Sequence, residues 1–122
     1  DNISKPINFC HWNDYDRKLL NDYKKNKLYI SWPDLFADEA DCKNAQKFWF
    51  EQYGKHGTCS LDSYKQEQYF DLAMDLKDKF DLLQSFKSHG IIRGGDYTLK
   101  SINDTVRAIT TGVPSLWCTA QM

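Results

Sequence analysis

The side chains best suited to chemistry lie between Phe48 and Cys59, in the sequence FWFEQYGKHGTC. If residues 42–55 are helical, Gln52 and His56 are four residues apart and share one face of the helix. Phe48 and Trp49 lie one turn earlier on that side. An aromatic surface, an amide and an imidazole on one face can stack a flat ring and exchange a proton.

Lysines add local positive charge to this region, at Lys43, Lys47 and Lys55. The chain as a whole adds none, because 16 basic and 17 acidic residues give a net charge of -1. Its overall field therefore does not attract polyanions, and contact with a phosphodiester would depend on this local cluster.

Each of these residues also has a plainer interpretation. Aromatic residues at helical spacing usually pack in a core, so packing is one role for Phe48 and Trp49, and substrate contact is the other. A histidine in the last turn of a helix interacts favourably with the helix dipole, which would explain His56 without chemistry. The same explanation serves for His89, which precedes Gly90.

The four cysteines are too widely spaced for a CxxC zinc ribbon and allow three disulfide pairings; they are Cys10, Cys42, Cys59 and Cys118. Cys10, His11, His56 and Cys59 are zinc-ligand types, but a disulfide between Cys10 and Cys59 explains the same cysteines more simply. Such a bond would close a loop of roughly 50 residues and stabilise the fold by about 4 kcal/mol in the chain-entropy model.

Cysteine content and glycosylation sequons favour an oxidising, extracytoplasmic setting. The sequons are at Asn2 and Asn103, and each is an acceptor pattern for N-glycosylation. No apolar run approaches the roughly 18 residues of a membrane span, and no signal-like segment opens the chain.

Length and composition predict at most one domain with a real core, since 41% of the 122 residues are hydrophobic and 15% aromatic,. Alternating charges indicate a short solvated helix over 14–27, and a helical pattern resumes over 38–57 after Pro33. His56 would then lie in the last helical turn. The only candidate strands are residues 28–30 and 90–92.

Later in the chain, apolar residues recur at helical spacing from Tyr69 to Leu83 and predict a longer helix. We expect this helix to break near Asp81, a possible N-cap, and to end at Gly90. A further amphipathic helix is predicted from Leu99 to Ile109, with Asn103 at the edge of its apolar stripe.

The sequence FWFEQYGKHGTC resembles the second active-site motif of the ribonuclease T2 family, usually written FWxxEWxKHGTC. The segments QYFDLAMDLKDKFDLLQSFKSHGII and YTLKSINDTVRAITTGVPSL, together with WPDL at Trp32, resemble the S-ribonucleases of nightshade-family plants. The resemblance covers essentially the whole chain. It implies an α+β fold and an endoribonuclease that needs neither metal nor cofactor.

Enzymes of this family cleave single-stranded RNA by attack of the 2′-hydroxyl on the adjacent phosphate, which gives a 2′,3′-cyclic phosphate. By resemblance, His56 is the catalytic base, and Lys55 stabilises the crowded phosphate. Gln52 stands where the consensus has glutamate, so it can orient a phosphate without adding charge, and we expect a base limb shifted to lower pH. Phe48 and Trp49 are assigned as substrate-binding residues.

A second departure is the absence of the HGLWPD motif, which carries the other catalytic histidine of the family. We therefore expect residues 1–122 to be the middle portion of a single domain, truncated at both ends, mostly helical and lacking much of the central sheet. His11 is the in-chain alternative for the second histidine. Cys10 would pair with Cys59, while Cys42 and Cys118 would have partners outside the chain, and the fragment alone should fold poorly and be inactive.

The resemblance further implies a secreted, monomeric glycoprotein, with glycans at Asn2 and Asn103, that acts as a stylar cytotoxin in self-incompatibility. Its expected partners are single-stranded RNA and F-box-type recognition proteins of pollen, and it has no membrane association. Residues 3–7 and 14–27 match the variable recognition segments by position, although solvated loop and helix explain them as well. The alternatives are a non-catalytic RNA-binding, storage or defence relative and a housekeeping ribonuclease.

Overall fold

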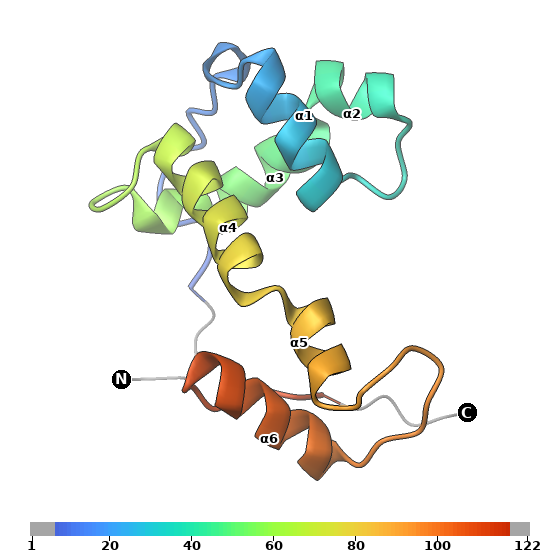
Figure 1. Ribbon diagram of the computed structural model, residues 1–122. Coiled ribbons are helices and arrows are strands. Elements are labelled where there is room, and N and C mark those ends of the chain that lie inside the picture. The colour runs from blue at the N-terminus through green and yellow to red at the C-terminus, as the bar shows by residue number, and fades with distance from the viewer. Residues whose placement is uncertain (1–6, 118–122) are drawn as a thin grey trace. The chain divides into compact units, whose positions relative to one another are not determined.

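Every regular element within residues 7–117, the part of the chain that the computed structural model describes, is a helix (Figure 1). In chain order the elements are η1 (Arg17–Leu19), α1 (Asp22–Ser31), α2 (Glu39–Ala45), α3 (Lys47–Lys55), η2 (Gly57–Ser60), α4 (Gln66–Phe80), α5 (Leu82–Ser88) and α6 (Leu99–Thr110). The expectation of a mostly helical chain is confirmed. Asn2 and Cys118, for which the sequence predicts a glycan and an external partner, lie outside the described residues.

Polar side chains set the start of several helices by accepting hydrogen bonds from the free N–H groups of the first turn. The pairs are Asn21 with the N–H of Lys24 in α1, Asp38 with Asp41 in α2, Asp81 with Gln84 in α5, and Thr98 with Ser101 in α6. The predicted break and N-cap at Asp81 are therefore confirmed.

The candidate strand at residues 28–30 is wrong, because these residues belong to α1. The N–H of Trp32 donates to the carbonyl of Leu28 at 2.6 Å, which continues the helical hydrogen bonding to the end of α1. Leu28 is fully buried, so this turn of the helix delivers its side chain to the core.

The candidate strand at residues 90–92 is also wrong, because a helix-terminating turn occupies this segment. Gly90 has a φ of 76°, a left-handed value that glycine adopts without strain. The N–H of Ile91 donates to the carbonyl of Phe86 at 2.9 Å, and that of Gly90 to Lys87 at 3.1 Å. This pattern is a Schellman motif, which satisfies the last carbonyls of α5.

The single helix predicted over 38–57 is two helices, because Gln46 interrupts it. The φ of Gln46 is 50°, outside the right-handed helical region. Its buried side chain accepts a hydrogen bond from the Tyr15 hydroxyl at 2.6 Å and donates to the Arg17 carbonyl at 3.5 Å. Contacts with residues about 30 positions earlier therefore hold the break in place.

The chain divides into two compact units, Asp1–Asp75 and Leu76–Met122. The first contains the buried core, formed by Leu20, Leu28, Cys42, Trp49, Tyr53, Phe70 and Met74. Phe70 and Met74 come from α4, and Trp49 and Tyr53 come from α3. The core therefore fixes α3, which carries the chemical motif, against the first part of α4.

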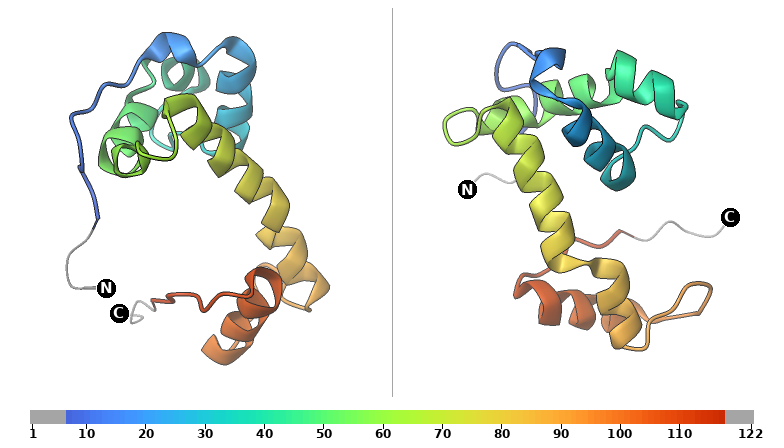
Figure 2. Two further views of the ribbon diagram at one scale, coloured as in Figure 1. Left: turned by 90° about the vertical axis from the view of Figure 1, so that its left-hand side faces the viewer. Right: turned by 45° about the horizontal axis from the view of Figure 1, so that its top comes forward.

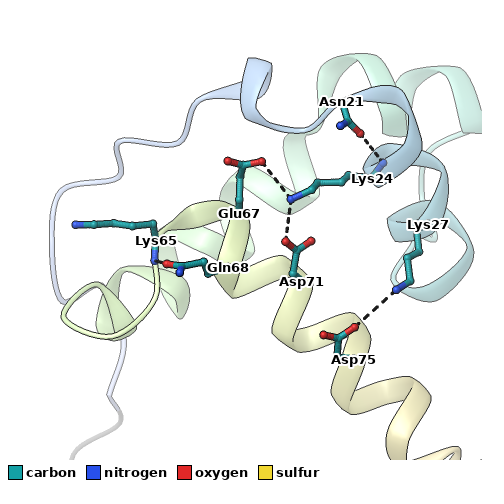
Figure 3. Close-up of polar contacts among 8 residues, drawn as sticks. All are labelled: Asn21, Lys24, Lys27, Lys65, Glu67, Gln68, Asp71 and Asp75. Carbon is teal, nitrogen blue, oxygen red and sulfur yellow. Dashed lines mark hydrogen bonds and ion pairs between the residues drawn. The ribbon is translucent and has the colours of Figure 1, made fainter.

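Ion pairs join α1 to α4 within this first unit (Figure 3). The Nζ atom of Lys24 lies 3.1 Å from Glu67 and 2.8 Å from Asp71, and that of Lys27 lies 3.8 Å from Asp75. The three acidic residues are spaced by four and so share one face of α4. Burial of Lys24 disfavours its charge, but the hydrogen bonds to Asp71 and Glu67 outweigh this effect and raise the pKa of Lys24.

In the second unit, α5 and α6 pack against each other (Figure 2). The helix predicted from Leu99 to Ile109 is confirmed as α6, and it ends where Thr111 adopts a φ of 59°. Asn103 is half-buried, and its Nδ2 donates to Asp104 at 3.2 Å. Among the described residues, no helix is both long enough and apolar enough to cross a membrane.

Candidate functional site

The Lys55–His56 pair lies at the C-terminal end of α3. Lys55 is the last helical residue, and His56 is the C-cap, with its N–H donating to the carbonyl of Gln52 at 2.9 Å. Both side chains are exposed. The helix thus ends with an ammonium group and an imidazole on consecutive residues, both exposed to solvent.

The residues that follow this pair hold the helix end in place. The hydroxyl of Thr58, which is fully buried, donates to the carbonyl of Gly54 at 2.9 Å and satisfies an acceptor that the helix leaves free. A Cβ on Gly57 would lie 2.3 Å from the ring of Tyr53, so only glycine fits there. In the motif KHGTC, the first two residues are therefore available for chemistry and the next two are structural.

The Cys10–Cys59 disulfide predicted from the resemblance is present. It ties the loop before α1 to the segment immediately after His56. Because both sulfur atoms are used in this bond, the zinc site considered for Cys10, His11, His56 and Cys59 is wrong. Among the described residues no group of three or more potential metal ligands comes together.

Two further contacts fix the same loop on α3. The N–H of Phe9 donates to the carbonyl of Lys55 at 2.8 Å, and the Nδ2 of Asn13 donates to the carbonyl of Phe50 at 3.0 Å. Phe9 has a φ of 49°, a strained value for a residue other than glycine. The last turn of α3 is therefore linked to residues 9–13 at two points, through the carbonyl of Phe50 before it and the carbonyl of Lys55 at its end.

Gln52 lies between two surface hollows. The first, here the Trp32 hollow, has a volume of about 630 Å³ and is lined by Ser31, Trp32, Pro33, Asp34, Leu35, Phe36, Lys47, Phe48, Glu51 and Gln52. The second, here the Trp12 hollow, has a volume of about 520 Å³ and is lined by Phe9, His11, Trp12, Asn13, Phe50, Glu51, Gln52, Gly54 and Lys55. The half-buried amide of Gln52 can therefore reach a ligand in either one.

The assignment of Trp49 as a substrate-binding residue is wrong. Its side chain has no exposed surface, and its indole N–H donates to the Trp32 carbonyl at 2.9 Å. A ring without an exposed face cannot stack on a nucleobase. Phe48 is different, because it is half-buried, lines the Trp32 hollow and meets the ring of Trp32 edge to face, with centroids 6.0 Å apart.

Charges around the hollows are mixed. Glu51 and Lys47 are exposed and lie 4.0 Å apart, one turn from each other on α3. Lys55 and His11 line the Trp12 hollow and supply its basic groups. Behind them, burial raises the pKa of Tyr53, with a smaller contribution from the charge of Asp14, so the phenol in the core stays neutral.

Sequence reasoning missed Asn13 and Phe9, which hold the helix end from a distance of 37 and 46 positions respectively. Neither residue carries a local signal, because a backbone carbonyl as acceptor leaves no trace in the sequence.

Cys42 is a buried free thiol that accepts a weak bond from the N–H of Asp34 at 3.5 Å. Its predicted external partner therefore remains a prediction.

Comparison with known proteins identifies the class to which this fold and motif belong. The model of the Ribonuclease T2 family matches residues 1–122. The chain therefore belongs to the ribonuclease T2 family.

Within this family the chain is similar to S-ribonucleases. It is 52% identical over 119 residues to Ribonuclease S-6 of Nicotiana alata, covering 98% of this chain and 55% of that protein. It is 52% identical over 112 residues to Ribonuclease S-2 of Solanum tuberosum, covering 92% and 50% respectively. The chain spans about half the length of these curated relatives.

The fold agrees with that of a solved relative. The crystal structure of the self-incompatibility associated SF11-RNase of Nicotiana alata matches with a TM-score of 0.89 and 32% identity, over 100% of this chain and 62% of that one. The predicted T2-like α+β class is thus confirmed. The absence of strands between residues 7 and 117 agrees with a chain that spans only part of such a fold.

Proposed function

We propose that residues 1–122 are part of a single ribonuclease T2 domain in a secreted endoribonuclease that cleaves single-stranded RNA. The observation that carries this proposal is the exposed Lys55–His56 pair at the end of α3, held by Thr58 and the Cys10–Cys59 disulfide. The surrounding structure keeps the two side chains in solvent and their backbone fixed. This arrangement suits proton transfer and charge stabilisation at a phosphodiester.

In the proposed reaction, His56 removes the proton of a ribose 2′-hydroxyl. The 2′-oxygen forms a bond to phosphorus as the bond from phosphorus to the 5′-oxygen breaks, which leaves a 2′,3′-cyclic phosphate. The 5′-oxygen takes a proton from an acid, for which His11 in the Trp12 hollow is the candidate within the described residues. Imidazole suits both tasks because its ordinary pKa is about 6.5.

Lys55 stabilises the negative charge that grows on the phosphate oxygens as the bonds exchange. The amide of Gln52, one turn before His56, orients the phosphate by hydrogen bonding without adding charge. Phe48 offers an aromatic edge in the Trp32 hollow, where a base adjacent to the cleaved bond can pack. The reaction needs neither a metal nor a cofactor.

We further propose a monomeric, glycosylated stylar cytotoxin of self-incompatibility, with F-box-type recognition proteins of pollen as partners. Similarity to S-ribonucleases over nearly the whole chain supports this role. Asn103 on α6, where the second glycan would attach, is half-buried and lines a surface hollow. Exchanging segments 3–7 and 14–27 between alleles and scoring pollen rejection tests the recognition role.

Catalysis is tested in the intact protein that contains this chain, by following cleavage of single-stranded RNA and detecting the cyclic phosphate by 31P NMR. We expect His56→Ala to lower kcat by about 10²- to 10⁴-fold and Lys55→Ala by about 10²- to 10³-fold. His89→Ala is the matched control, because His89 is exposed in the second unit and should leave the rate unchanged. Equal rates for wild type and His56→Ala would refute the proposed base.

A non-catalytic relative is the second candidate, favoured by Gln52 at the consensus glutamate position. It predicts that the intact protein binds single-stranded RNA without cleaving it. In that case the variants at positions 55 and 56 would weaken binding and no cyclic phosphate would form.

A further inference from the structure

We propose that Asn13 is a positioning residue for Lys55 and His56, acting through Gly54. This inference rests on the proposed function, since it concerns how the same helix end is aimed at substrate. The Asn13 side chain hydrogen-bonds to Phe50 and Tyr15 and to neither side chain of the pair. It acts on the backbone from which both of them project.

The side chain of Asn13 links two segments with both of its polar atoms. Its Nδ2 donates to the carbonyl of Phe50 at 3.0 Å, and its Oδ1 accepts from the N–H of Tyr15 at 3.3 Å. The first bond fastens α3 at Phe50, about one and a half turns before the pair,. The second fixes the orientation of the amide and so prevents it from rotating away from the helix.

Gly54 is the counterpart of Asn13 on α3. A Cβ at this position would lie 2.3 Å from the Nδ2 of Asn13 and 2.8 Å from its Cγ. Glycine costs helix stability in a helix interior, and Gly54 lies in the last turn of α3. Its presence therefore has a specific reason here, which is the close approach of the Asn13 amide.

The position of this contact connects it to the chemistry. Gly54 precedes Lys55 directly, and its carbonyl also accepts the hydroxyl of Thr58. The next carbonyl, that of Lys55, accepts the N–H of Phe9. The turn carrying the pair is thus held by Asn13 on one side and by Phe9 and the disulfide on the other, and removing Asn13 frees one side only.

The test uses Asn13→Asp in the intact protein, because aspartate keeps the acceptor for Tyr15 and lacks the donor for Phe50. We expect kcat on a dinucleotide substrate to fall by about 10- to 100-fold, as small misplacements of catalytic groups do, while KM changes by less than about twofold. The NMR signals of the His56 ring should shift, whereas those of His89 should not. Unchanged kcat and His56 signals would overturn the proposal, even if thermal stability fell.

Gly54→Ala provides a second route that leaves Asn13 itself intact. Its added methyl group should displace the Asn13 amide and lower kcat, although alanine favours the helix. In the Asn13→Ala background the same change meets no amide and only the Cβ of residue 13, at 3.3 Å, so it should lower kcat little further. If the losses of kcat from the two substitutions add in the double variant, the proposal is overturned. This comparison also tests the positioning role of Asn13 if Asn13→Asp does not fold.

A failure of the proposed function gives a different result. If the intact wild-type protein cleaves no RNA, the reaction proposed for His56 is wrong, and the positioning role is then decided by NMR alone. A His56 ring signal that is the same in wild type, Asn13→Asp and Gly54→Ala would show that Asn13 does not position the pair.

Discussion

Tyr15→Phe tests how the loop before α1 is held at Gln46, which separates α2 from α3. The Tyr15 hydroxyl donates to the Oε1 of Gln46 at 2.6 Å, and Gln46 is only 4% exposed. The rings of Phe50 and Phe70 meet the Tyr15 ring edge to face, with centroids at 5.9 Å and 6.2 Å. Phenylalanine keeps these ring contacts, so the substitution removes the hydroxyl and little else.

The expected loss of stability comes from the Oε1 atom of Gln46, which the substitution leaves without its hydrogen-bond donor. A buried acceptor without a donor costs about 1–3 kcal/mol, and the amide of Gln46 has little access to water in compensation. We therefore expect the free energy of unfolding at pH 7 to fall by about 1–3 kcal/mol. The change should appear in the urea midpoint, with an unchanged m-value.

The pH dependence of unfolding is an independent test of the same contact. Burial raises the pKa of Tyr15 above its ordinary value, against a smaller opposing effect of Arg17. The pKa of Tyr15 is therefore higher in the folded state than in the unfolded state. Its contribution to the free energy of unfolding is complete below about pH 10, the ordinary pKa of tyrosine, and is lost as pH rises further, by at most about 1.4 kcal/mol per pH unit for one group. The difference between wild type and Tyr15→Phe should therefore narrow above pH 10.

The assay is urea unfolding of the intact protein, followed by circular dichroism from pH 7 to pH 11. Burial also raises the pKa of Tyr53 and Tyr69, but both residues are present in each protein, so their effects cancel in the difference. Tyr23→Phe is the matched control, since Tyr23 is 74% exposed. A difference that is absent at pH 7, or constant up to pH 11, would refute the reasoning.

Two other predictions concern the α1–α4 contact and Gln52. Lys24→Met removes the ion pairs with Glu67 and Asp71 and should lower the free energy of unfolding by about 1 kcal/mol. The loss should be smaller in 1 M salt, which screens the charges. Lys100→Met is the control, because it removes an exposed ion pair with Asp104. Equal losses of unfolding free energy in the two lysine variants would contradict the stabilising role of the Lys24 ion pairs. Gln52→Glu places a carboxylate one turn before His56 and should move the base limb of kcat/KM to higher pH; an unchanged pH–rate profile would rule out the role given to Gln52.

Local signals predicted the parts of the fold in which neighbouring residues satisfy one another. The N-cap at Asp81 is encoded by a short polar side chain three positions before the N–H that it accepts,. The apolar spacing from Leu99 to Ile109 predicted α6 to within one residue. The motif at Lys55 and His56 likewise indicated a helix end, which the structure confirms.

Local signals failed where distant residues decided the outcome. Residues 28–30 have a strand-like composition, yet Leu28 enters the core as part of α1. Gln46 has no feature of a helix breaker, and its left-handed backbone depends on its contacts with Tyr15 and Arg17. Periodicity did not distinguish Phe48 from Trp49, because both were placed on the same side of α3.

The sequence by itself determined which residues we propose for the chemistry, since an adjacent lysine and histidine followed by GTC indicate the groups and the end of their helix. Only the tertiary structure decided that Trp49 is core and that Asn13 and Phe9 hold the helix end. The physical reason is that capping and periodicity act within a few residues, whereas burial and long-range hydrogen bonds depend on segments that meet only after folding.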